Sequence, residues 1–258
     1  MRFKITLRVH KNAYGNLLPI SYQYELSAWI YSVIAKSDHV YAAWLHDNGF
    51  ANFYKRFKMF VYSNLFPQCK VTDDRMSIPH DTMFLFLSFL PEKSTEEFVK
   101  GIFTENTFTL GDKKSKVQFQ VSNIEVLPIP SLKDREFQTL SPVVVSVRRD
   151  NGSIEYVSPE REDYGGMLIN NLKEKHLAFY DKAFEGDHHF EFELLSPVKS
   201  RLITIKTNTP QMTKVKGFHY CFRLQADEAL LQLMYEAGLG EKNATGFGMI
   251  GEIKNHML

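Results

Sequence analysis

A glycine-rich segment near the end of the chain has the residue types that bind phosphate or ribose groups. Its candidate contact residues are Gly238, Gly240, Lys242, Asn243, Gly246, Phe247 and Gly248. Glycines allow positive φ angles and let backbone N–H groups approach a ligand closely. The lysine adds a positive charge and the asparagine adds amide donors. The segment is therefore a candidate binding loop, and the alternative is a helix C-cap followed by a flexible turn.

The position of this segment in the chain limits the ligands it can serve. It lies between a helix expected at 227–237 and a strand expected at 247–253. Glycine loops that bind dinucleotides usually follow a strand and open a helix. The opposite order here disfavours a dinucleotide-binding fold.

Neither the cysteines nor the histidines form a pattern typical of a metal site. Cys69 and Cys221 are far apart in the sequence and form no Cys-x-x-Cys pair. His188 and His189, beside Asp187, would diverge to opposite faces of a strand, so they would hardly share one ion, and a loop is the better interpretation. We expect no metal and no cofactor, and the cysteine usage fits a reducing cytoplasm.

Composition places few other limits on the function. The chain has 258 residues, 44% of them hydrophobic, which is enough for one large domain or two small ones. The net charge is only +1, so any surface for nucleic acid must be a local patch. The chain opens on an alternating strand rather than a signal peptide, and no apolar run approaches the roughly 20 residues that span a bilayer. We expect a soluble protein that is not exported and does not associate with a membrane.

The first half of the chain predicts the order strand, helix, strands, helix, strand. Alternation indicates a strand at 3–9, and apolar spacings of three and four indicate a helix at 22–36. Ser37 and Asp38 offer an N-cap for a short second helix through His46, and Asn48-Gly49 provides its C-terminal stop. Strands are expected at 57–65, 71–78 and 82–89, a helix from a Ser94-x-x-Glu97 capping box to Phe103, and a strand at 117–127.

After a linker with two prolines at 128–134, the order of elements repeats. The expected elements are a strand at 141–149, a hairpin turn at 150–152, a helix at 159–179, strands at 190–195, 202–206 and 216–224, a helix at 227–237 and a strand at 247–253. This order predicts an α+β fold of two tandem ferredoxin-like (RRM-like) domains. We expect their bounds at 1–127 and 135–258.

The chain resembles the Cas6 family of CRISPR-associated endoribonucleases over nearly its whole length. The resemblance is carried by the opening Met-Arg-Phe-Lys-Ile, by Tyr22, Leu26 and Ile30 in the stretch 19–34, and by Leu140-Ser141-Pro142-Val143. Its most specific part is Gly238-x-Gly240-Glu-Lys-Asn-x-x-Gly246-Phe-Gly248-Met. Members of the family carry two ferredoxin-like domains and place this loop against RNA, so the resemblance implies the same fold and an RNA-binding role for the loop.

The resemblance also implies a reaction. The family cuts CRISPR precursor RNA within its repeats without a metal, by attack of the 2′-hydroxyl, leaving a 2′,3′-cyclic phosphate and a 5′-hydroxyl. The family's catalytic positions match Tyr31 and His46, and Lys58 through the pattern Lys58-x-Phe60-x-Tyr62-Ser63. Lys55 needs a shorter insertion and is the alternative catalytic lysine.

Each of these side chains suits the role that the resemblance gives it. His46 would act as general acid or base, because imidazole titrates near neutral pH and the end of a helix favours its protonated form. Tyr31 would orient the 2′-hydroxyl or share the proton transfer, and Lys58 would neutralise phosphate charge. The alternatives are a surface histidine, a half-buried tyrosine and a solvated lysine.

Basic residues for RNA contacts are expected in the second half. The resemblance favours Lys199 and Arg201, which precede a strand in the domain that carries the glycine-rich loop. Arg148 and Arg149 are the next candidates, and a solvated surface is the alternative for both pairs. Such contacts set affinity and salt dependence rather than sequence preference.

The expected partner is CRISPR repeat RNA, as precursor and as mature guide RNA. A CRISPR effector complex is a further candidate partner, and both a monomer and a homodimer stay open. The main rival function is a noncatalytic RNA-binding subunit of such a complex, which would keep the fold but lack the chemistry. A metal-dependent hydrolase of small molecules is a third hypothesis, and no carboxylate–histidine spacing favours it.

Overall fold

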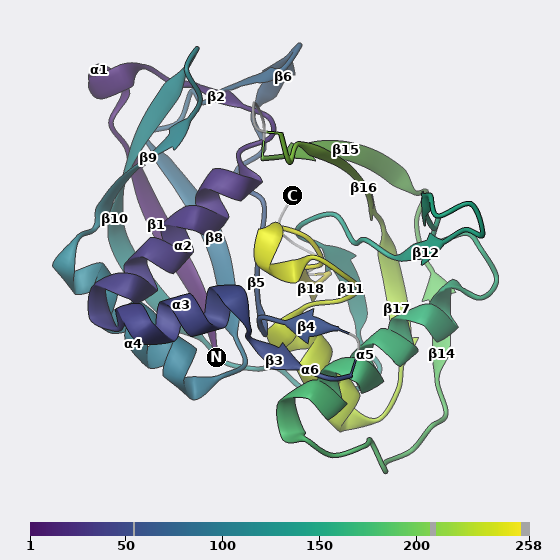
Figure 1. Cartoon of the computed structure of the whole chain (residues 1–258). Helices are drawn as coiled ribbons and strands as arrows, with labels where there is room; N and C mark the ends of the chain where they lie inside the picture. The colour runs from purple at the N-terminus through teal and green to yellow at the C-terminus, as the bar shows by residue number, and fades with distance from the viewer. Residues whose placement is uncertain (54, 207–209, 254–258) are drawn as a thin grey trace.

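The computed structural model describes residues 1–53, 55–206 and 210–253, and shows two α+β halves packed side by side (Figure 1). The last five residues of the predicted second domain therefore lie outside this description. Each half has its own hydrophobic core, one drawn from residues 3–121 and the other from residues 132–250. No helix in the described part is long and apolar enough to cross a membrane.

The first half is built on a five-stranded antiparallel sheet in the order β5-β8-β1-β10-β9. Its elements are β1 (Arg2–Val9), α1 (Lys11–Tyr14), β2 (Leu17–Pro19), α2 (Gln23–Ser37), α3 (His39–Asp47), β3 (Phe50–Ala51), β4 (Arg56–Phe57), β5 (Phe60–Tyr62), β6 (Lys70–Thr72), β7 (Arg75–Ser77), β8 (Thr82–Phe89), α4 (Glu92–Thr104), β9 (Thr107–Gly111) and β10 (Lys116–Leu127). Helices α2 and α4 pack on each other across one face of this sheet (Figure 1).

The second half repeats this plan on a four-stranded sheet in the order β14-β17-β11-β18. Its elements are β11 (Glu136–Thr139), β12 (Ser146–Arg148), β13 (Ile154–Tyr156), α5 (Tyr164–Tyr180), β14 (Glu191–Leu194), β15 (Lys199–Ile205), β16 (Thr213–His219), β17 (Cys221–Gln225), α6 (Glu228–Ala237), the 3₁₀ turn η1 (Asn243–Thr245) and β18 (Ile250–Glu252). Helices α5 and α6 pack on each other.

Both halves have ferredoxin-like topology. The main elements run β1-α2-β5-β8-α4-β10 in the first half and β11-α5-β14-β17-α6-β18 in the second. In both sheets the first and third of these strands are central neighbours, with the second strand beyond the third and the fourth beside the first. The prediction of two tandem ferredoxin-like domains is therefore confirmed, whereas the exact domain bounds stay a prediction.

The strongest hydrophobic patterns in the first half correctly predicted a strand and a helix, β1 and α2. The alternating side chains of β1 are buried on one face, and Leu26, Ile30 and Ile34 of α2 lie in the core beneath them. Asp38 caps α3 by accepting a hydrogen bond from the Tyr41 backbone N–H, at 2.8 Å. These elements form where local pattern and tertiary packing agree.

Two strand predictions in the first half were wrong in detail. The segment 71–78 is not one strand but the hairpin β6–β7, because Asp73 turns the chain with a φ of 54°. The segment 57–65 is divided into β4 and β5 at Met59, which also has a positive φ. Strand β9 was not predicted, although its buried Phe108 and Leu110 alternate with threonines.

The expected capping box of α4 does not form. The helix begins at Glu92, after Pro91, so Ser94 and Glu97 lie inside it. The Ser94 hydroxyl bonds the Tyr41 hydroxyl at 2.5 Å, and Glu97 accepts a hydrogen bond from Ser37. Both side chains therefore join α4 to α2 and α3 instead of capping their own helix.

The second half departs from the prediction mainly at strand ends. The strand expected at 141–149 is replaced by β11, which ends before it, and by β12 at its far end. The strand expected at 216–224 is divided at Tyr220 into β16 and β17, which belong to different sheets. Helix α5 begins at Tyr164 rather than at 159, and β18 is shorter than expected.

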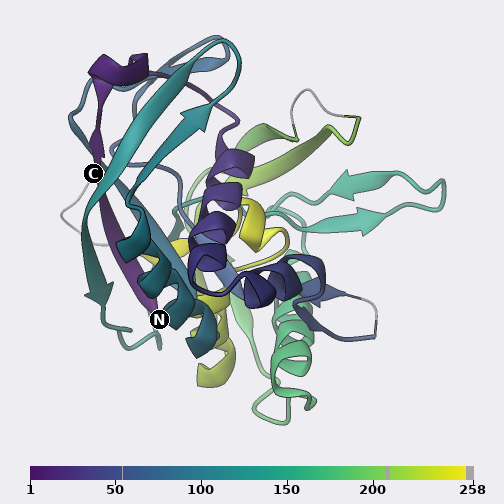
Figure 2. The same ribbon diagram turned by 60° about the vertical axis from the view of Figure 1, so that its left-hand side comes forward.

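Two antiparallel ribbons leave the second half, and Figure 2 shows them projecting away from the sheets. One is β12–β13, whose turn at 150–152 was predicted, and the other is β15–β16. Both ribbons carry basic residues that the sequence singled out, so these residues stand on projecting surfaces rather than on the central sheets.

Buried Arg2 joins the two halves. Its guanidinium donates hydrogen bonds to the carbonyl oxygens of Ile250, at 2.8 Å, and Tyr235, at 2.5 Å, and it lies over the Tyr235 ring. Burial lowers the pKa of Arg2 to about 10, which still leaves it charged at neutral pH. A strand of the first half is thereby fixed to α6 and β18 of the second.

We predict that Arg2→Ala lowers the free energy of unfolding by about 2–4 kcal/mol, because it leaves two carbonyl oxygens without their charged donor. Lys4→Ala on the same strand is the matched control and should change it by less than about 1 kcal/mol, since its ion pair with Glu125 is partly exposed. Chemical denaturation measures both. Equal effects of the two variants would show that Arg2 is not a link between the halves.

Candidate functional site

Three of the side chains singled out from the sequence meet at one edge of the first half. Tyr31 comes from α2, His46 from the last turn of α3, and Lys58 from the residue after β4. The rings of Tyr31 and His46 lie edge to face, with centroids 5.1 Å apart. The Lys58 ammonium donates a hydrogen bond to the His46 carbonyl oxygen, at 2.6 Å. The fold thus gathers a phenol, an imidazole and an ammonium group around the last turn of α3.

Tyr31 is half-buried at this edge. Its ring lies between the His46 ring and the buried ring of Phe60, whose centroid is 5.4 Å away. Burial raises the pKa of the Tyr31 phenol above its ordinary value. The phenol therefore stays neutral around pH 7 and can donate a hydrogen bond, but it cannot serve as an anionic base.

His46 presents its ring to solvent. Nδ1 lies 2.8 Å from Oδ1 of Asp47, and both side chains are largely exposed. This contact leaves Nε2 as the nitrogen available to a ligand. Asp47 orients the ring, and it was missed in the sequence because adjacency to a histidine carries no spacing signal.

Lys58 reaches His46 because the chain turns back sharply after α3. Gly49 has a φ of 61°, and a Cβ at that position would lie only 2.5 Å from the Phe57 carbonyl oxygen. Burial and, next, the nearby Arg56 guanidinium lower the pKa of Lys58 from its ordinary value, whereas Asp47 opposes this shift. With one N–H bonded to His46, the ammonium keeps two donors for an anion.

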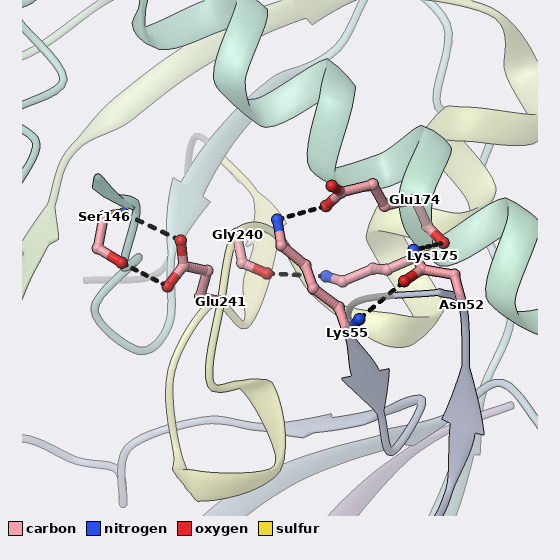
Figure 3. Close-up of polar contacts among 7 residues, drawn as sticks. All are labelled: Asn52, Lys55, Ser146, Glu174, Lys175, Gly240 and Glu241. Carbon is pink, nitrogen blue, oxygen red and sulfur yellow. Dashed lines mark hydrogen bonds and ion pairs between the residues drawn. The ribbon is translucent and has the colours of Figure 1, made fainter. Parts of the chain in front are cut away.

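Lys55 is paired with an acidic residue of the second half. Its ammonium forms an ion pair with Glu174 of α5, at 2.6 Å, and its backbone N–H donates to the Asn52 side chain (Figure 3). The pair spans the two halves of the molecule. The geometry therefore places Lys58, and not Lys55, beside Tyr31 and His46.

The glycine-rich loop is packed far more tightly than a free binding loop. The Asn243 side chain donates to the carbonyl oxygens of Leu239, at 3.1 Å, and Phe247, at 3.0 Å, and so closes the loop on itself. Phe247 has 0% exposed surface and packs in a small core cluster with Val144. Its ring cannot stack on a ligand in this structure, and among the candidate contact residues of the loop, Lys242 is the exposed one.

Buried Lys175 of α5 anchors this loop. Its ammonium donates to the carbonyl oxygens of Gly238, at 2.6 Å, and Gly240, at 2.9 Å; Figure 3 shows it reaching the loop. Burial lowers the pKa of Lys175 to about 7, and Glu241 opposes this shift. Nothing in the sequence indicates this role, because a lysine on a helix is usually solvated.

A cleft of about 680 Å³ lies between the halves, next to the loop. Lys58 lies in its wall and its ammonium bonds the His46 carbonyl oxygen, whereas Tyr31 and His46 are not among the residues of the wall. Glu241 is also in the wall and is held by the Ser146 N–H and hydroxyl (Figure 3). The cationic residues of the wall are Lys55, Arg56, Lys58, Arg148, Lys175 and Lys242. This excess of positive charge suits an anionic ligand.

The other basic residues expected to bind RNA are spread around the molecule. Arg149 leaves β12 and forms an ion pair with Glu155, at 2.9 Å, and it does not line the cleft. Lys199 and Arg201 lie on β15, outside the cleft wall. Three sequence candidates for RNA binding therefore line the cleft, namely Arg148, Lys242 and Asn243.

No group of three or more His, Cys, Asp or Glu side chains in residues 1–53, 55–206 and 210–253 is arranged to hold a metal ion. His188 and His189 lie outside any helix or strand, in the loop before β14, as expected.

Both halves of this chain are similar to known proteins. A family model described as CRISPR-associated protein Cas6, N-terminal, matches residues 17–125, and one described as CRISPR associated protein Cas6, C-terminal, matches residues 127–252. The chain belongs to the Cas6 family.

Relatives and solved structures agree with this assignment. CRISPR-associated endoribonuclease Cas6 1 of Methanocaldococcus jannaschii is 30% identical over 93% of this chain and 89% of its own. CRISPR-associated endoribonuclease Cas6 of Pyrococcus furiosus is 30% identical over 97% of this chain and 89% of its own. A solved structure of a Cas6-related protein from Pyrococcus furiosus covers 99% of both chains with a TM-score of 0.84 at 23% identity, and so shares the fold.

We predict that Gly248→Ala disrupts the glycine-rich loop. Gly248 has a φ of 82°, and an added Cβ would overlap the Leu239 carbonyl oxygen and the Asn243 amide. The free energy of unfolding should fall by about 3 kcal/mol or more, from backbone strain and overpacking together.

Gly152→Ala is the matched control for this prediction. Gly152 has a φ of 80°, but an added Cβ would meet nothing within 4 Å, so strain alone should cost about 1 kcal/mol. Denaturant unfolding of both variants separates the two terms. If both variants lose the same stability, the close packing of the loop contributes nothing.

Proposed function

We propose that this chain is a metal-independent endoribonuclease that cuts CRISPR precursor RNA within its repeats. The observation that carries the proposal is the convergence of Tyr31, His46 and Lys58 beside a cationic cleft. The names of the two relatives as CRISPR-associated endoribonucleases support the RNA substrate.

The reaction uses the nucleophile that RNA already carries. The 2′-hydroxyl attacks the adjacent phosphorus and loses its proton, the bond to the 5′-oxygen breaks, and that oxygen takes up a proton. The products are a 2′,3′-cyclic phosphate and a 5′-hydroxyl. Such a reaction needs alignment, proton transfer and stabilisation of the phosphorane, each of which side chains can supply.

The three side chains divide these tasks according to their chemistry. His46 transfers a proton through Nε2, while Asp47 holds the ring at Nδ1. Tyr31, with its raised pKa, stays neutral and orients the 2′-hydroxyl by hydrogen bonding. Lys58 directs its two remaining N–H groups to the non-bridging oxygens of the phosphorane.

The cleft gives the substrate a path to these groups. Arg148 and Lys242 lie in its wall from the second half, and Lys58 from the first. Phosphate groups along a single strand would meet these cations in turn, and the packed glycine-rich loop would form one side of the path.

We predict that His46→Ala slows single-turnover cleavage of labelled repeat RNA by about 100-fold or more, because proton transfer in the transition state is lost. His39→Ala is the matched control. His39 lies two turns earlier on α3 and is exposed, so its loss should leave the rate unchanged. A wild-type rate for His46→Ala would remove His46 from the mechanism.

Two conditions separate this mechanism from its rivals. Cleavage should persist in EDTA, and it should stop when the scissile nucleotide carries a 2′-deoxy sugar. Loss of cleavage in EDTA would indicate a metal-dependent enzyme. RNA that is bound but never cut would indicate a noncatalytic RNA-binding subunit of a CRISPR effector complex.

We predict that Lys58 sets the alkaline limit of kcat/KM. The cation is present below the lowered pKa of Lys58 and is lost as pH rises through it, so the rate should fall there. Lys58→Arg keeps the charge to much higher pH and should move this fall upward. Lys55→Arg is the control and should leave the profile unchanged; the reverse pattern would make Lys55 the catalytic lysine.

A further inference from the structure

The hairpin β3–β4 lies between α3 of its own half and α5 of the second half (Figure 1). The Phe50 ring on β3 contacts both helices. Its centroid is 5.3 Å from the Trp44 ring of α3 and 5.0 Å from the Phe179 ring of α5. The hairpin therefore joins α5 to the helix that carries His46.

Cations at the end of this hairpin bind the C-terminal end of α3. The Lys58 ammonium donates a hydrogen bond to the His46 carbonyl oxygen, at 2.6 Å, and the Arg56 guanidinium donates to the Asp47 carbonyl oxygen, at 3.2 Å. The last carbonyl groups of a helix have no partner within the helix, and positive charge is favourable at that end. The hairpin thus fixes the helical turn that presents His46 and Asp47.

Glu174 of α5 holds the hairpin from the other side. Its carboxylate forms an ion pair with the Lys55 ammonium, at 2.6 Å, and its carbonyl oxygen lies 3.5 Å from the Asn52 amide nitrogen (Figure 3). The Lys55 backbone N–H donates to the Asn52 side chain at 2.8 Å, so the two hairpin residues are also bonded to each other. A partly exposed ion pair contributes little to the stability of the fold. We therefore expect its effect on the position of the hairpin.

The residues on either side of Lys58 pack against the second half. Met59 is buried in one cluster with Leu233 and Ala237 of α6. Phe57 is partly buried against the same cluster. The backbone of Lys58 is therefore held at the interface between the halves, while its ammonium reaches back to α3.

We propose that Glu174 is a positioning residue for RNA cleavage, which holds the β3–β4 hairpin and, through it, Lys58 and His46 in the arrangement that cuts. The proposal rests on the proposed function, because it takes Lys58 and His46 as the groups that act on RNA. Placement matters, since a displacement of about 1 Å can slow a reaction about 100-fold. The second half thereby acts on the rate of the chemical step, although the three reacting side chains all belong to the first half.

Single-turnover cleavage at saturating repeat RNA tests this positioning. Glu174→Ala should slow cleavage about fivefold or more, because the hairpin is held less firmly. The affinity for RNA with a 2′-deoxy scissile nucleotide should not fall, since the freed Lys55 cation stays in the wall of the cleft. Glu185→Ala is the matched control, because Glu185 pairs with Lys182 at 2.8 Å within the second half. A wild-type rate for Glu174→Ala, whatever its affinity, would overturn the proposal.

Exchange of the two charges separates positioning from the loss of a charge. Lys55→Glu and Glu174→Lys each place like charges opposite one another, and each should slow cleavage at saturating RNA about fivefold or more. The double variant forms the ion pair in the opposite direction, so its rate should return to within about twofold of the wild-type rate. A double variant as slow as the slower single variant would show that the pair does not position the hairpin.

The NMR signals of the His46 ring give a readout that does not involve RNA. The Tyr31 ring lies edge to face with this ring, so its ring current contributes to the His46 chemical shifts. The His46 signals are identified by their absence in His46→Gln. Glu174→Ala should change these shifts, the double charge exchange should restore them, and Glu185→Ala should leave them unchanged. Unchanged shifts in Glu174→Ala would overturn the proposal.

The failure of this proposal is distinguishable from failure of the proposed function. A wild-type chain that cuts repeat RNA, together with a Glu174→Ala variant that cuts it equally fast, would refute the positioning role alone. A wild-type chain that binds the RNA and never cuts it would refute the endoribonuclease. In that case a change of the His46 shifts in Glu174→Ala would still show that α5 controls the placement of this ring.

Discussion

The contact between the glycine-rich loop and α2 is the interaction on which the arrangement of the two halves depends. The Ser27 hydroxyl donates to the Ala244 carbonyl oxygen at 2.6 Å, and a Cβ on Gly246 would lie 2.8 Å from Gln23. Ser27 is one helical turn before Tyr31, so a loop of the second half is bonded to the helix that carries the Tyr31 phenol. Lys175 holds the other end of the loop. Residues 241–245 of this loop form part of the cleft wall, so these contacts help to shape the cleft.

Charge is distributed in the molecule so that a nearly neutral chain offers cationic surfaces. Most surface acids are used in ion pairs, as Glu174 is with Lys55 and Glu155 with Arg149. The acid in the cleft wall, Glu241, is satisfied by Ser146. What remains available to a ligand is mostly positive, although the net charge of +1 shows nothing of this.

Local pattern predicted the fold well and the site only in part. Strand β8 and helix α2 followed their hydrophobic periods, but Ser94 failed as a cap because its hydroxyl is bonded by Tyr41 across the core. The resemblance supplied Tyr31, His46 and Lys58, yet their proximity depends on Gly49 turning the chain back. Lys175 could not be found, because nothing in a single sequence distinguishes a buried helical lysine from a solvated one.

Gly238, Gly246 and Gly248 are tightly packed, so the same glycine motif in another chain indicates the packing of its loop. These glycines are buried and are required by neighbouring backbone and side chains of the same molecule. A chain with another residue in place of His46 would still need these glycines in order to pack the loop against its two domains. The motif is thus diagnostic of architecture, and it carries no information about the side chains around α3.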